Sequence, residues 1–326
     1  DVYKRQTMKN FRFAIMGAGN IANKFCDAVK RMGDCEVAAV ASKSMERAKG
    51  FAEKNGIKAA YDSYEKMLAE EKPDCVYIAV TQDAHYALCM LCLDYKTPVL
   101  CEKAMFLNSA QAEEVLTRAE KEKVFVMEAM WSRFLPAIKM AKQWMDEGKI
   151  GTPSFIDTAI GFLAPVDKDN RYYSPKLGGG ASYDITVYAY ELTTFMIEQP
   201  VEDVQVSAVW SDTGVDISDQ VTLRFPGILA SLRTSFAAGL HERMVIYGNE
   251  GKIVIPHPHF AEEVFLYDKN NELVMRFQDT VTENGFLYEI EEVANCIRDG
   301  RTESPVVPHS LTRECAKLFD RILETR

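Results

Sequence analysis

Short apolar runs alternate with amphipathic stretches along the first part of the chain. Apolar residues are nearly continuous at 74–80, as they are in a central parallel strand that is covered on both faces. The spacing of Ile21, Phe25 and Val29 predicts a helix after the first run. The whole pattern predicts strands at 11–16, 36–41, 59–60, 74–80, 98–101 and 124–127, with further helices at 45–54, 64–70, 86–95 and 110–121. This rhythm predicts one doubly wound parallel sheet.

A glycine-rich turn joins the first strand to the first helix. Its pattern is G-x-G-x-x-A, with Gly17, Gly19 and Ala22 at the fixed positions. In a dinucleotide-binding turn, the first glycine permits the tight turn, the second lets the backbone approach a pyrophosphate, and the small third residue lets the helix pack on the strand. N–H groups at the helix start then face the phosphates. We therefore predict a Rossmann domain in which Gly17, Gly19, Asn20, Ile21 and Ala22 bind the cofactor.

The pattern changes in the second part of the chain. Several strands follow one another through Gly or Pro turns, which predicts a mostly antiparallel open sheet within an α+β domain. Strands are predicted at 154–162, 201–210, 220–225, 230–236, 243–247 and 264–267, and helices at 136–147, 185–197, 286–298 and 311–323. The predicted fold class is therefore α/β, with a Rossmann domain at 8–128 and an α+β domain at 129–326. Residues 1–7 lack either pattern, and we expect a non-native leader that precedes a start at Met8.

Charge and hydropathy restrict the class of partner. The net charge is −10 and the sequence has no basic cluster, which argues against nucleic acid or an anionic membrane surface. No apolar run reaches the roughly 18 residues of a membrane span. A small-molecule substrate is the partner that we expect.

Eight cysteines occur in the chain, mostly within apolar strand or helix patterns, and no secretory signal precedes them. This distribution indicates reduced, buried thiols and a cytoplasmic protein. Cys89 and Cys92 form C-x-x-C, but no second ligand pair follows at the spacing of a zinc site. We assign no metal to the protein.

The residues after the second strand decide between the two nicotinamide cofactors. An NAD enzyme usually carries an acid there for the ribose hydroxyls. This chain instead has Ser42, Lys43 and Arg47, which suit a 2′-phosphate, so we predict NADP over NAD. The alternative is that both cations are solvated residues at a helix start.

Three further strings resemble the Gfo/Idh/MocA family of oxidoreductases. They are Cys101-Glu-Lys-Ala104, Gly178-Gly-Gly-Ala-Ser-Tyr-Asp-Ile-Thr-Val-Tyr188 and Val245-Ile-Tyr-Gly-Asn-Glu-Gly-Lys-Ile253. The stretch at 128–136, Glu-Ala-Met-Trp-Ser-Arg-Phe-Leu-Pro, is similar to the branch that contains the dimeric dihydrodiol and xylose dehydrogenases. Two positions differ from the family pattern, because Ala104 replaces a proline and Thr186 replaces a glycine.

The resemblance implies a catalytic group formed by Lys103, Asp184 and Tyr188. Lys103 would lie beside the nicotinamide, and Tyr188 would donate or accept the proton. Asp184, one helical turn from Tyr188, would bind substrate hydroxyls or pair with Lys103. We expect the ammonium to favour the phenolate and to bring the pKa of Tyr188 closer to neutral pH.

The resemblance also implies the lining of the cleft. Thr81, His85 and Glu102 join the residues that bind the cofactor, whereas Trp131, Arg133 and Phe162 line the substrate pocket together with Asp184 and Tyr188.

The implied activity is reversible hydride transfer between NAD(P) and a secondary alcohol or carbonyl of a sugar, polyol or cyclic diol, without a metal. The resemblance implies a homo-oligomer, a dimer first of all, built through the exposed face of the second sheet. Two alternatives stay open. They are a catalytically silent NAD(P)-binding regulator and an NAD-dependent glycosidase of the same family.

Overall fold

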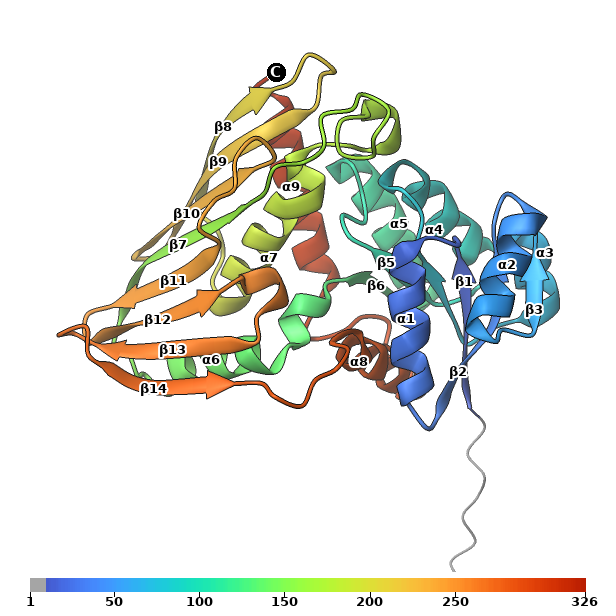
Figure 1. The fold of residues 1–326 in the computed structure, drawn as a ribbon, viewed down its shortest axis with the longest axis horizontal. Helices are drawn as coiled ribbons and strands as arrows, with labels where there is room; N and C mark the ends of the chain where they lie inside the picture. The colour runs from blue at the N-terminus through green and yellow to red at the C-terminus, as the bar shows by residue number, and fades with distance from the viewer. Residues whose placement is uncertain (1–9) are drawn as a thin grey trace, which may run out of the picture.

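The computed structural model describes residues 10–326, and the predicted leader at 1–7 lies outside the described residues. Two sheets, each with helices packed against it, lie side by side in the molecule (Figure 1). The predicted α/β class, with a parallel Rossmann sheet and a mostly antiparallel second sheet, is confirmed. No helix between residues 10 and 326 combines the length and the apolar character that crossing a membrane requires.

The first sheet has the strand order of a Rossmann domain. Over the described residues it contains six parallel strands in the order β3-β2-β1-β4-β5-β6. The strands are β1 (Phe11–Met16), β2 (Cys35–Ala41), β3 (Ala59–Tyr61), β4 (Cys75–Ile78), β5 (Val99–Glu102) and β6 (Val126–Ala129). The order reverses between β1 and β4, and a ligand of such a sheet binds beyond the carboxyl ends of the strands at that point.

Five helices connect these strands. They are α1 (Asn20–Arg31), α2 (Met45–Asn55), α3 (Tyr64–Glu71), α4 (His85–Asp94) and α5 (Ser109–Glu122). Side-chain caps start three of them, because Ser44, Ser63 and Asn108 accept hydrogen bonds from backbone N–H groups in the first turn. α1 has no such cap.

The second sheet is larger and open on one side. Within 10–326 its order is β14-β13-β12-β11-β7-β10-β9-β8, and neighbours run antiparallel except β7 and β10, which run parallel. Its strands are β7 (Pro153–Gly161), β8 (Asp203–Trp210), β9 (Asp216–Phe225), β10 (Ile228–Ser235), β11 (Arg243–Gly248), β12 (Gly251–Pro256), β13 (Glu263–Asp268) and β14 (Leu273–Gln278). The sequence pattern predicted six of these strands and missed β12 and β14.

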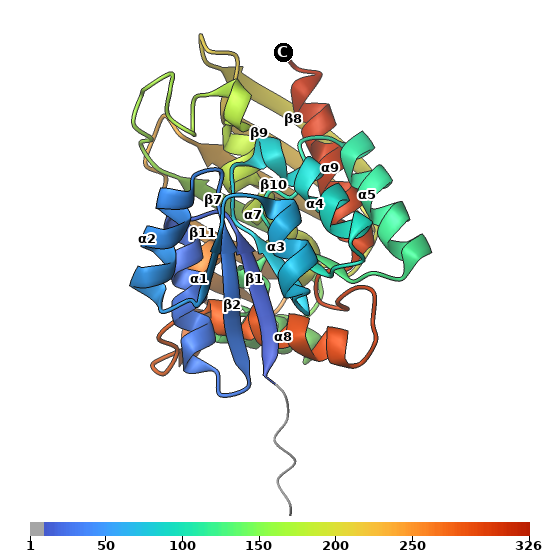
Figure 2. The ribbon, with the colours of Figure 1, turned by 90° about the vertical axis from the view of Figure 1, so that its right-hand side faces the viewer.

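The helices of the second part cover one face of this sheet and also reach the Rossmann domain. α6 (Pro136–Asp146) packs on β12 and β13, and α7 (Val187–Met196) packs on β7 and β10. α8 (Phe286–Arg298) contacts α1, and α9 (His309–Leu323) contacts both α5 and β8 (Figure 2). These contacts fix the edge of the parallel sheet against the inner face of the larger one.

Candidate active site

The glycine-rich turn has the shape that a dinucleotide requires. Gly17 has a φ of +111°, and a Cβ there would lie 2.3 Å from the carbonyl oxygen of Ala79, so no other residue fits. Gly19 precedes α1 without a side-chain cap, and the side chain of Ala22 is fully buried against the sheet. The exposed start of α1 at Asn20 therefore leaves backbone N–H groups for phosphate oxygens. These residues fit a dinucleotide cofactor.

The end of β2 brings the three residues of the NADP prediction together. Ser42 is buried, and its N–H donates to the carbonyl oxygen of Tyr61 at 3.1 Å. Lys43 and Arg47 are exposed, and the N–H of Arg47 donates to the Ser44 hydroxyl at 3.3 Å. Two cations therefore stand at the start of α2, beside the loop that a ribose phosphate would approach.

His85 is fixed by the backbone on both sides of its ring. The side chain is buried, Nδ1 lies 3.0 Å from the carbonyl oxygen of Ala104, and Nε2 lies 3.1 Å from that of Val80. Burial lowers the pKa of His85. A neutral imidazole has one N–H group, so one ring nitrogen donates to one of these two carbonyl oxygens while the other nitrogen lies near the second. The Lys103–Ala104 peptide bond next to this contact is cis. Thr81, half-buried, precedes the short 3₁₀ turn that leads to His85.

Lys103, Asp184 and Tyr188 converge, although 81 residues separate the first two in sequence. The ammonium of Lys103 donates to the backbone oxygen of Asp184 at 2.6 Å and to its carboxylate Oδ1 at 2.8 Å. The same nitrogen lies 4.7 Å from the centre of the Tyr188 ring. One positive charge therefore faces both a carboxylate and the phenol.

The charges of this group follow from burial and pairing. Burial opposes the charge on Lys103, but Asp184 and Tyr188 outweigh it and raise the pKa of Lys103. Burial also opposes the charge on Asp184, but Lys103 and Arg171 lower the pKa of that carboxyl. Lysine and aspartate are thus an ion pair at neutral pH.

The pKa of Tyr188 differs from the expectation that Lys103 would bring it closer to neutral pH. Burial raises its pKa to about 12, and the opposing effects of Lys103 and of the hydrogen bond from Trp131 are smaller. The ammonium acts in the predicted direction, but removal of the phenol from water outweighs it. Tyr188 is therefore a neutral phenol at pH 7.

A π-helical segment places Asp184 and Tyr188. The pattern predicted a regular helix over 185–197, but Ser182–Thr186 is π-helical and α7 follows it. Polar groups from the large sheet hold this segment. Asp216 accepts from the N–H of Ser182 at 2.6 Å, and the Thr186 hydroxyl donates to Asp219 at 2.7 Å. Thr186, which departs from the glycine of the family pattern, thus anchors this segment to β9.

Of the three predicted pocket residues, Trp131 adjoins this group, and Phe162 is connected to it through Tyr172 and Arg171. The indole N–H of Trp131 donates to the Tyr188 hydroxyl at 3.0 Å, which fixes the phenol. Phe162 packs with Tyr172 and Phe236, at ring-centre distances of 5.6 and 5.3 Å, at the end of β7. The rings of Phe162, Tyr172 and Phe236 thus form an aromatic cluster to which residues 163–177 contribute Tyr172.

Arg133 is placed differently. It is buried, its guanidinium lies 3.0 Å from the carboxylate of Glu191, and it donates to the backbone oxygen of Val306 at 2.9 Å. These partners hold the guanidinium inside the protein, so we leave Arg133 out of the proposed substrate site.

Two residues of the site have no signal in the sequence motifs. Arg171 lies 3.3 Å from Oδ1 of Asp184 and donates to the hydroxyl of Tyr172 at 2.9 Å. The ring centre of His259 lies 5.4 Å from that of Tyr188. Both come from segments without periodicity. Arg171 reaches the carboxylate of Asp184, and His259 reaches the phenol because Pro258–Phe260 packs on α7.

Glu102 lies at the carboxyl end of β5, directly before Lys103. It accepts a hydrogen bond from the hydroxyl of Tyr77, and burial raises its pKa. Glu289 on α8 is fully buried close by, and its carboxyl oxygens have no hydrogen-bond partner within residues 10–326. Burial and the charge of Glu102 raise the pKa of Glu289.

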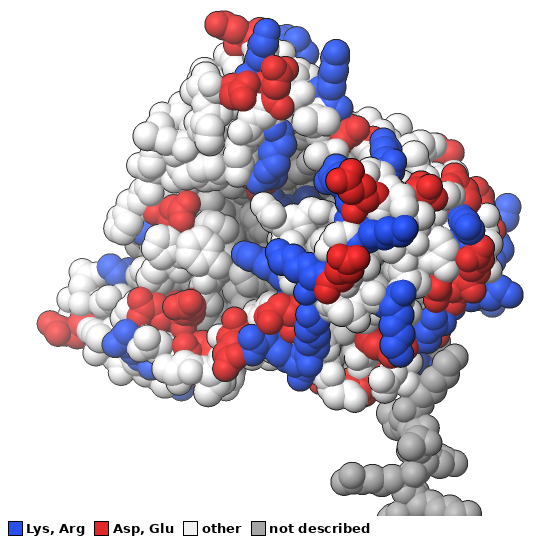
Figure 3. Space-filling view, turned by 45° about the vertical axis from the view of Figure 1, so that its right-hand side comes forward, with Lys and Arg blue, Asp and Glu red and all other residues white. Residues whose placement is uncertain are grey.

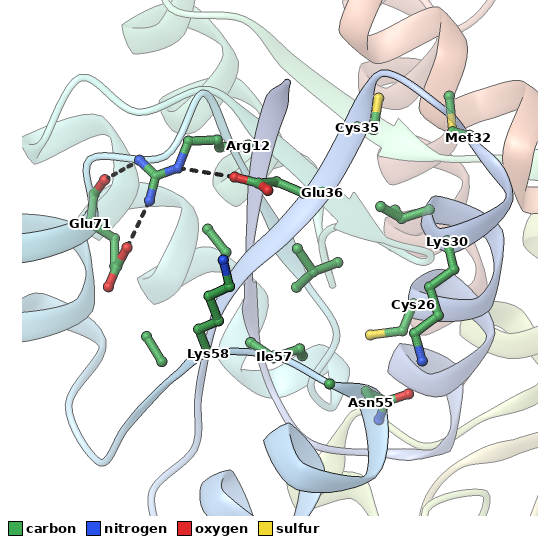
Figure 4. A pocket seen from close by; sticks show the side chains of 15 residues that line it. Arg12, Cys26, Lys30, Met32, Cys35, Glu36, Asn55, Ile57, Lys58 and Glu71 are labelled. Carbon is green, nitrogen blue, oxygen red and sulfur yellow. Dashed lines mark hydrogen bonds and ion pairs between the residues drawn. The ribbon is translucent and has the colours of Figure 1, made fainter. Parts of the chain in front are cut away.

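A separate cavity of about 460 Å³ lies between α1 and the first residues of β2. Arg12 there pairs with Glu71 at 2.8 Å and Glu36 at 3.7 Å, and burial raises the pKa of both Cys26 and Cys35 to about 12 (Figure 4). β2 starts at this cavity and ends at Ala41, directly before Ser42. The cavity therefore lies at the opposite end of the strand from the nucleotide-binding turn, and we assign it no role.

The hollow between the two domains has Lys and Arg side chains along its rim (Figure 3). No cluster of three or more metal-ligating side chains occurs in the described part of the chain. A cofactor with phosphate groups suits such a rim.

The glycine-rich turn follows β1 and Lys103 follows β5, so both lie beyond the carboxyl ends of strands of the same parallel sheet, which suits an oxidoreductase with a dinucleotide cofactor. Residues 11–130 match the family described as "Oxidoreductase family, NAD-binding Rossmann fold", and residues 138–254 match the "GFO/IDH/MocA C-terminal domain". The chain belongs to the Gfo/Idh/MocA family of oxidoreductases.

The similarity to known proteins covers nearly the whole chain. The trans-1,2-dihydrobenzene-1,2-diol dehydrogenase of Xenopus tropicalis is 31% identical over 323 residues, which cover 96% of this chain and 97% of the relative. The aldose-aldose oxidoreductase of Caulobacter crescentus, solved with glycerol, superposes with a TM-score of 0.87 at 20% identity over 97% of both chains. A 3-ketoreductase of Actinomadura kijaniata, solved with NADP and TDP-benzene, has a TM-score of 0.84 at 22% identity over 96% of this chain and 97% of its own.

Proposed function

We propose that this protein reversibly oxidises a secondary alcohol of a sugar, polyol or cyclic diol with a nicotinamide cofactor. One observation carries the proposal. The Lys103 ammonium binds Asp184 at 2.6 and 2.8 Å and lies 4.7 Å from the ring of Tyr188, beyond the carboxyl end of β5. A named diol dehydrogenase among the relatives supports the class of substrate.

Each residue of this group has a distinct part in the chemistry. In the direction of reduction, the neutral phenol of Tyr188 donates its proton to the carbonyl oxygen of the substrate, and in oxidation the same oxygen receives the hydroxyl proton. Lys103 offsets negative charge that develops on the substrate oxygen. Asp184 keeps the ammonium charged and oriented. When bound, the nicotinamide cofactor supplies or accepts the hydride.

The proposed cofactor is NADP, with NAD as the alternative. Lys43 and Arg47 are exposed at the start of α2 and can pair with a 2′-phosphate, and no acidic residue stands between Ser42 and Met45. We expect a lower KM for NADP than for NAD. A clear preference for NAD would contradict this part of the proposal.

The direct experiment is an assay of cofactor reduction with a panel of aldoses, polyols and cyclic diols. Lys103→Met and Tyr188→Phe should each lower kcat by about 10²-fold or more, because each removes a group that handles charge or a proton in the transition state. Lys121→Met, on the exposed side of α5, is the control and should keep the wild-type rate.

Two results of that assay would change the proposal. Near-wild-type rates of the Lys103 and Tyr188 variants would remove these residues from the mechanism. Tight binding of NADPH without turnover across the panel would instead favour a regulator that has kept the fold.

We also propose a dimer formed through the open face of the large sheet, and a cytoplasmic location. Phe155, Leu229 and Tyr247 lie in register on the adjacent strands β7, β10 and β11, and each is more than a third exposed. All eight cysteines are free and buried, which suits a reducing compartment.

A further inference from the structure

His259 lies beside the catalytic phenol. It belongs to the short turn η5 (Pro258–Phe260), which follows β12 and contacts both α7 and the turn at Trp131. Its ring centre is 5.4 Å from that of Tyr188 and 4.3 Å from that of Phe260, which meets it edge-on. The imidazole is thus held by aromatic neighbours on the substrate side of the site.

The imidazole has no hydrogen-bond partner among residues 10–326. Its Nδ1 is buried and unpaired. The neighbouring His257 differs, since its Nδ1 pairs with the carboxylate of Glu242 at 2.9 Å. Buried polar atoms in proteins are nearly always paired, so an unpaired one beside a catalytic group indicates a partner that arrives with the ligand.

The imidazole of His259 is neutral at pH 7, which suits an uncharged ligand. Burial lowers the pKa of His259 to about 4; Lys103 and His257 also lower it, whereas Glu242 and Asp184 raise it. At neutral pH the ring therefore has one N–H donor and one acceptor nitrogen. A hydroxyl group, which both donates and accepts, is a matching ligand.

We propose that His259 binds the hydroxyl next to the reacting carbon and thereby selects vicinal diols over simple alcohols. This inference rests on the proposed function, because Tyr188 and Lys103 take the reacting oxygen. In a vicinal diol, the second hydroxyl lies beside the hydroxyl that reacts. The imidazole of His259 likewise lies beside the phenol of Tyr188, so the two side chains can each take one of these hydroxyls. His259 is then a specificity-determining residue of the site.

The test compares paired substrates that differ by one hydroxyl. The pairs are trans-cyclohexane-1,2-diol with cyclohexanol, and D-glucose with 2-deoxy-D-glucose. In His259→Leu we expect kcat/KM to fall by about tenfold or more for the member with the adjacent hydroxyl, and by less than about threefold for the other. His259→Asn, which keeps a donor and an acceptor, should recover part of the loss.

The control is His257→Leu, two residues earlier in the same turn and also against Phe260. It should leave the ratio of the two substrates unchanged if the turn itself is intact. An equal loss for both members of a pair in His259→Leu, or no loss in either, would overturn the inference while leaving the proposed function in place.

Binding gives a second measurement that does not depend on turnover. The chain has five histidines, so NMR of protein labelled at the imidazole rings can follow each one. The diol should shift the resonance that disappears in His259→Asn, and cyclohexanol should shift it much less. If the wild type oxidises no diol or sugar, the proposed function fails, and an unshifted His259 resonance then rejects this inference separately.

Discussion

Tyr188 is where a single hydrogen bond has the clearest chemical effect. Its pKa is raised by burial, whereas Lys103 and the indole N–H of Trp131 lower it. The indole N–H of Trp131 thus stabilises the phenolate form of Tyr188, the residue that we propose as acid and base.

The pH dependence of alcohol oxidation should report this hydrogen bond. Phenolate becomes more abundant as pH rises, so we expect kcat/KM for oxidation to rise toward alkaline pH in the wild type. Trp131→Phe removes the donor, raises the pKa of Tyr188 further and should move the rising limb to higher pH. Trp210→Phe, on the distant strand β8, should leave the limb in place. An unmoved limb in Trp131→Phe would show that the indole does not tune the phenol.

The sequence motifs were sufficient to find Lys103, Asp184 and Tyr188 as candidates, and the structure brings them together. Motifs could not find His259 or Arg171. Each lies in a segment without a repeating pattern. His259 reaches the phenol because η5 packs on α7, whereas Arg171 reaches the carboxylate of Asp184 from the segment that follows β7. The sign of the pKa shift of Tyr188 was also out of reach, since it depends on burial.

At the scale of elements, the buried pair of Arg133 and Glu191 joins α7 to the turn that follows β6. Burial raises the pKa of Glu191 to about 8, and Arg133 opposes that shift. Burial also lowers the pKa of Arg133. With a pKa of about 8, the carboxyl of Glu191 is largely protonated at neutral pH, and the guanidinium of Arg133 is the charge that the pair holds inside the protein.

Arg133→Met should destabilise the protein by about 1–3 kcal/mol, because it removes the donor to the backbone oxygens of Val306 and Glu191 and leaves the carboxyl of Glu191 buried without a partner. The double variant Arg133→Met/Glu191→Met should recover much of this loss. Arg321→Met, an exposed change on α9, should stay within about 0.5 kcal/mol of the wild type. Chemical denaturation measures all three, and a double variant no more stable than Arg133→Met would argue against the pair.

Glu289 on α8 is a buried carboxyl that lowers the stability of the folded protein at neutral pH, whereas Arg133, as the partner of Glu191, stabilises it. Its pKa is raised in the folded protein, so the folded state loses stability as pH rises above the ordinary value of 4.5, where the unfolded carboxyl ionises. Glu289→Met should therefore stabilise the protein by about 1–3 kcal/mol at neutral pH and by less near pH 4.5. The exposed Glu291→Met on the same helix is the control. A gain in melting temperature that is independent of pH would contradict this account.

The elements themselves were largely predictable, with instructive exceptions. All six strands of the Rossmann sheet were predicted, because buried parallel strands are continuously apolar. β12 was missed because only Asn249 and Glu250 separate it from β11, and β14 was missed because it is an exposed edge strand. The π-helical turn at Ser182–Thr186 could not be predicted, since it depends on partners from β9.

At the scale of the whole molecule, the open face of the large sheet is the surface through which we propose that two chains form a dimer. Phe155, Leu229 and Tyr247 form a row across three strands, with exposed fractions of 38%, 43% and 37%. Adjacent half-exposed apolar side chains of this kind suit the dimer interface that we propose.

We expect light scattering to give twice the 36.8 kDa mass of one chain. Phe155→Glu/Tyr247→Glu should give monomers, because two charges would be buried in the interface. Val281→Glu, an exposed apolar residue beyond β14, should leave the dimer intact. A wild type of monomer mass would overturn the proposed assembly.

The burial of all eight cysteines makes the protein well suited to site-directed labelling. Maleimide dyes react with accessible thiolates, and burial shields the native thiols from the reagent. One cysteine introduced on α2 and one on β14 would therefore take up a fluorophore pair without any prior removal of native residues. Energy transfer between the two dyes would then follow the separation of the domains as ligands bind.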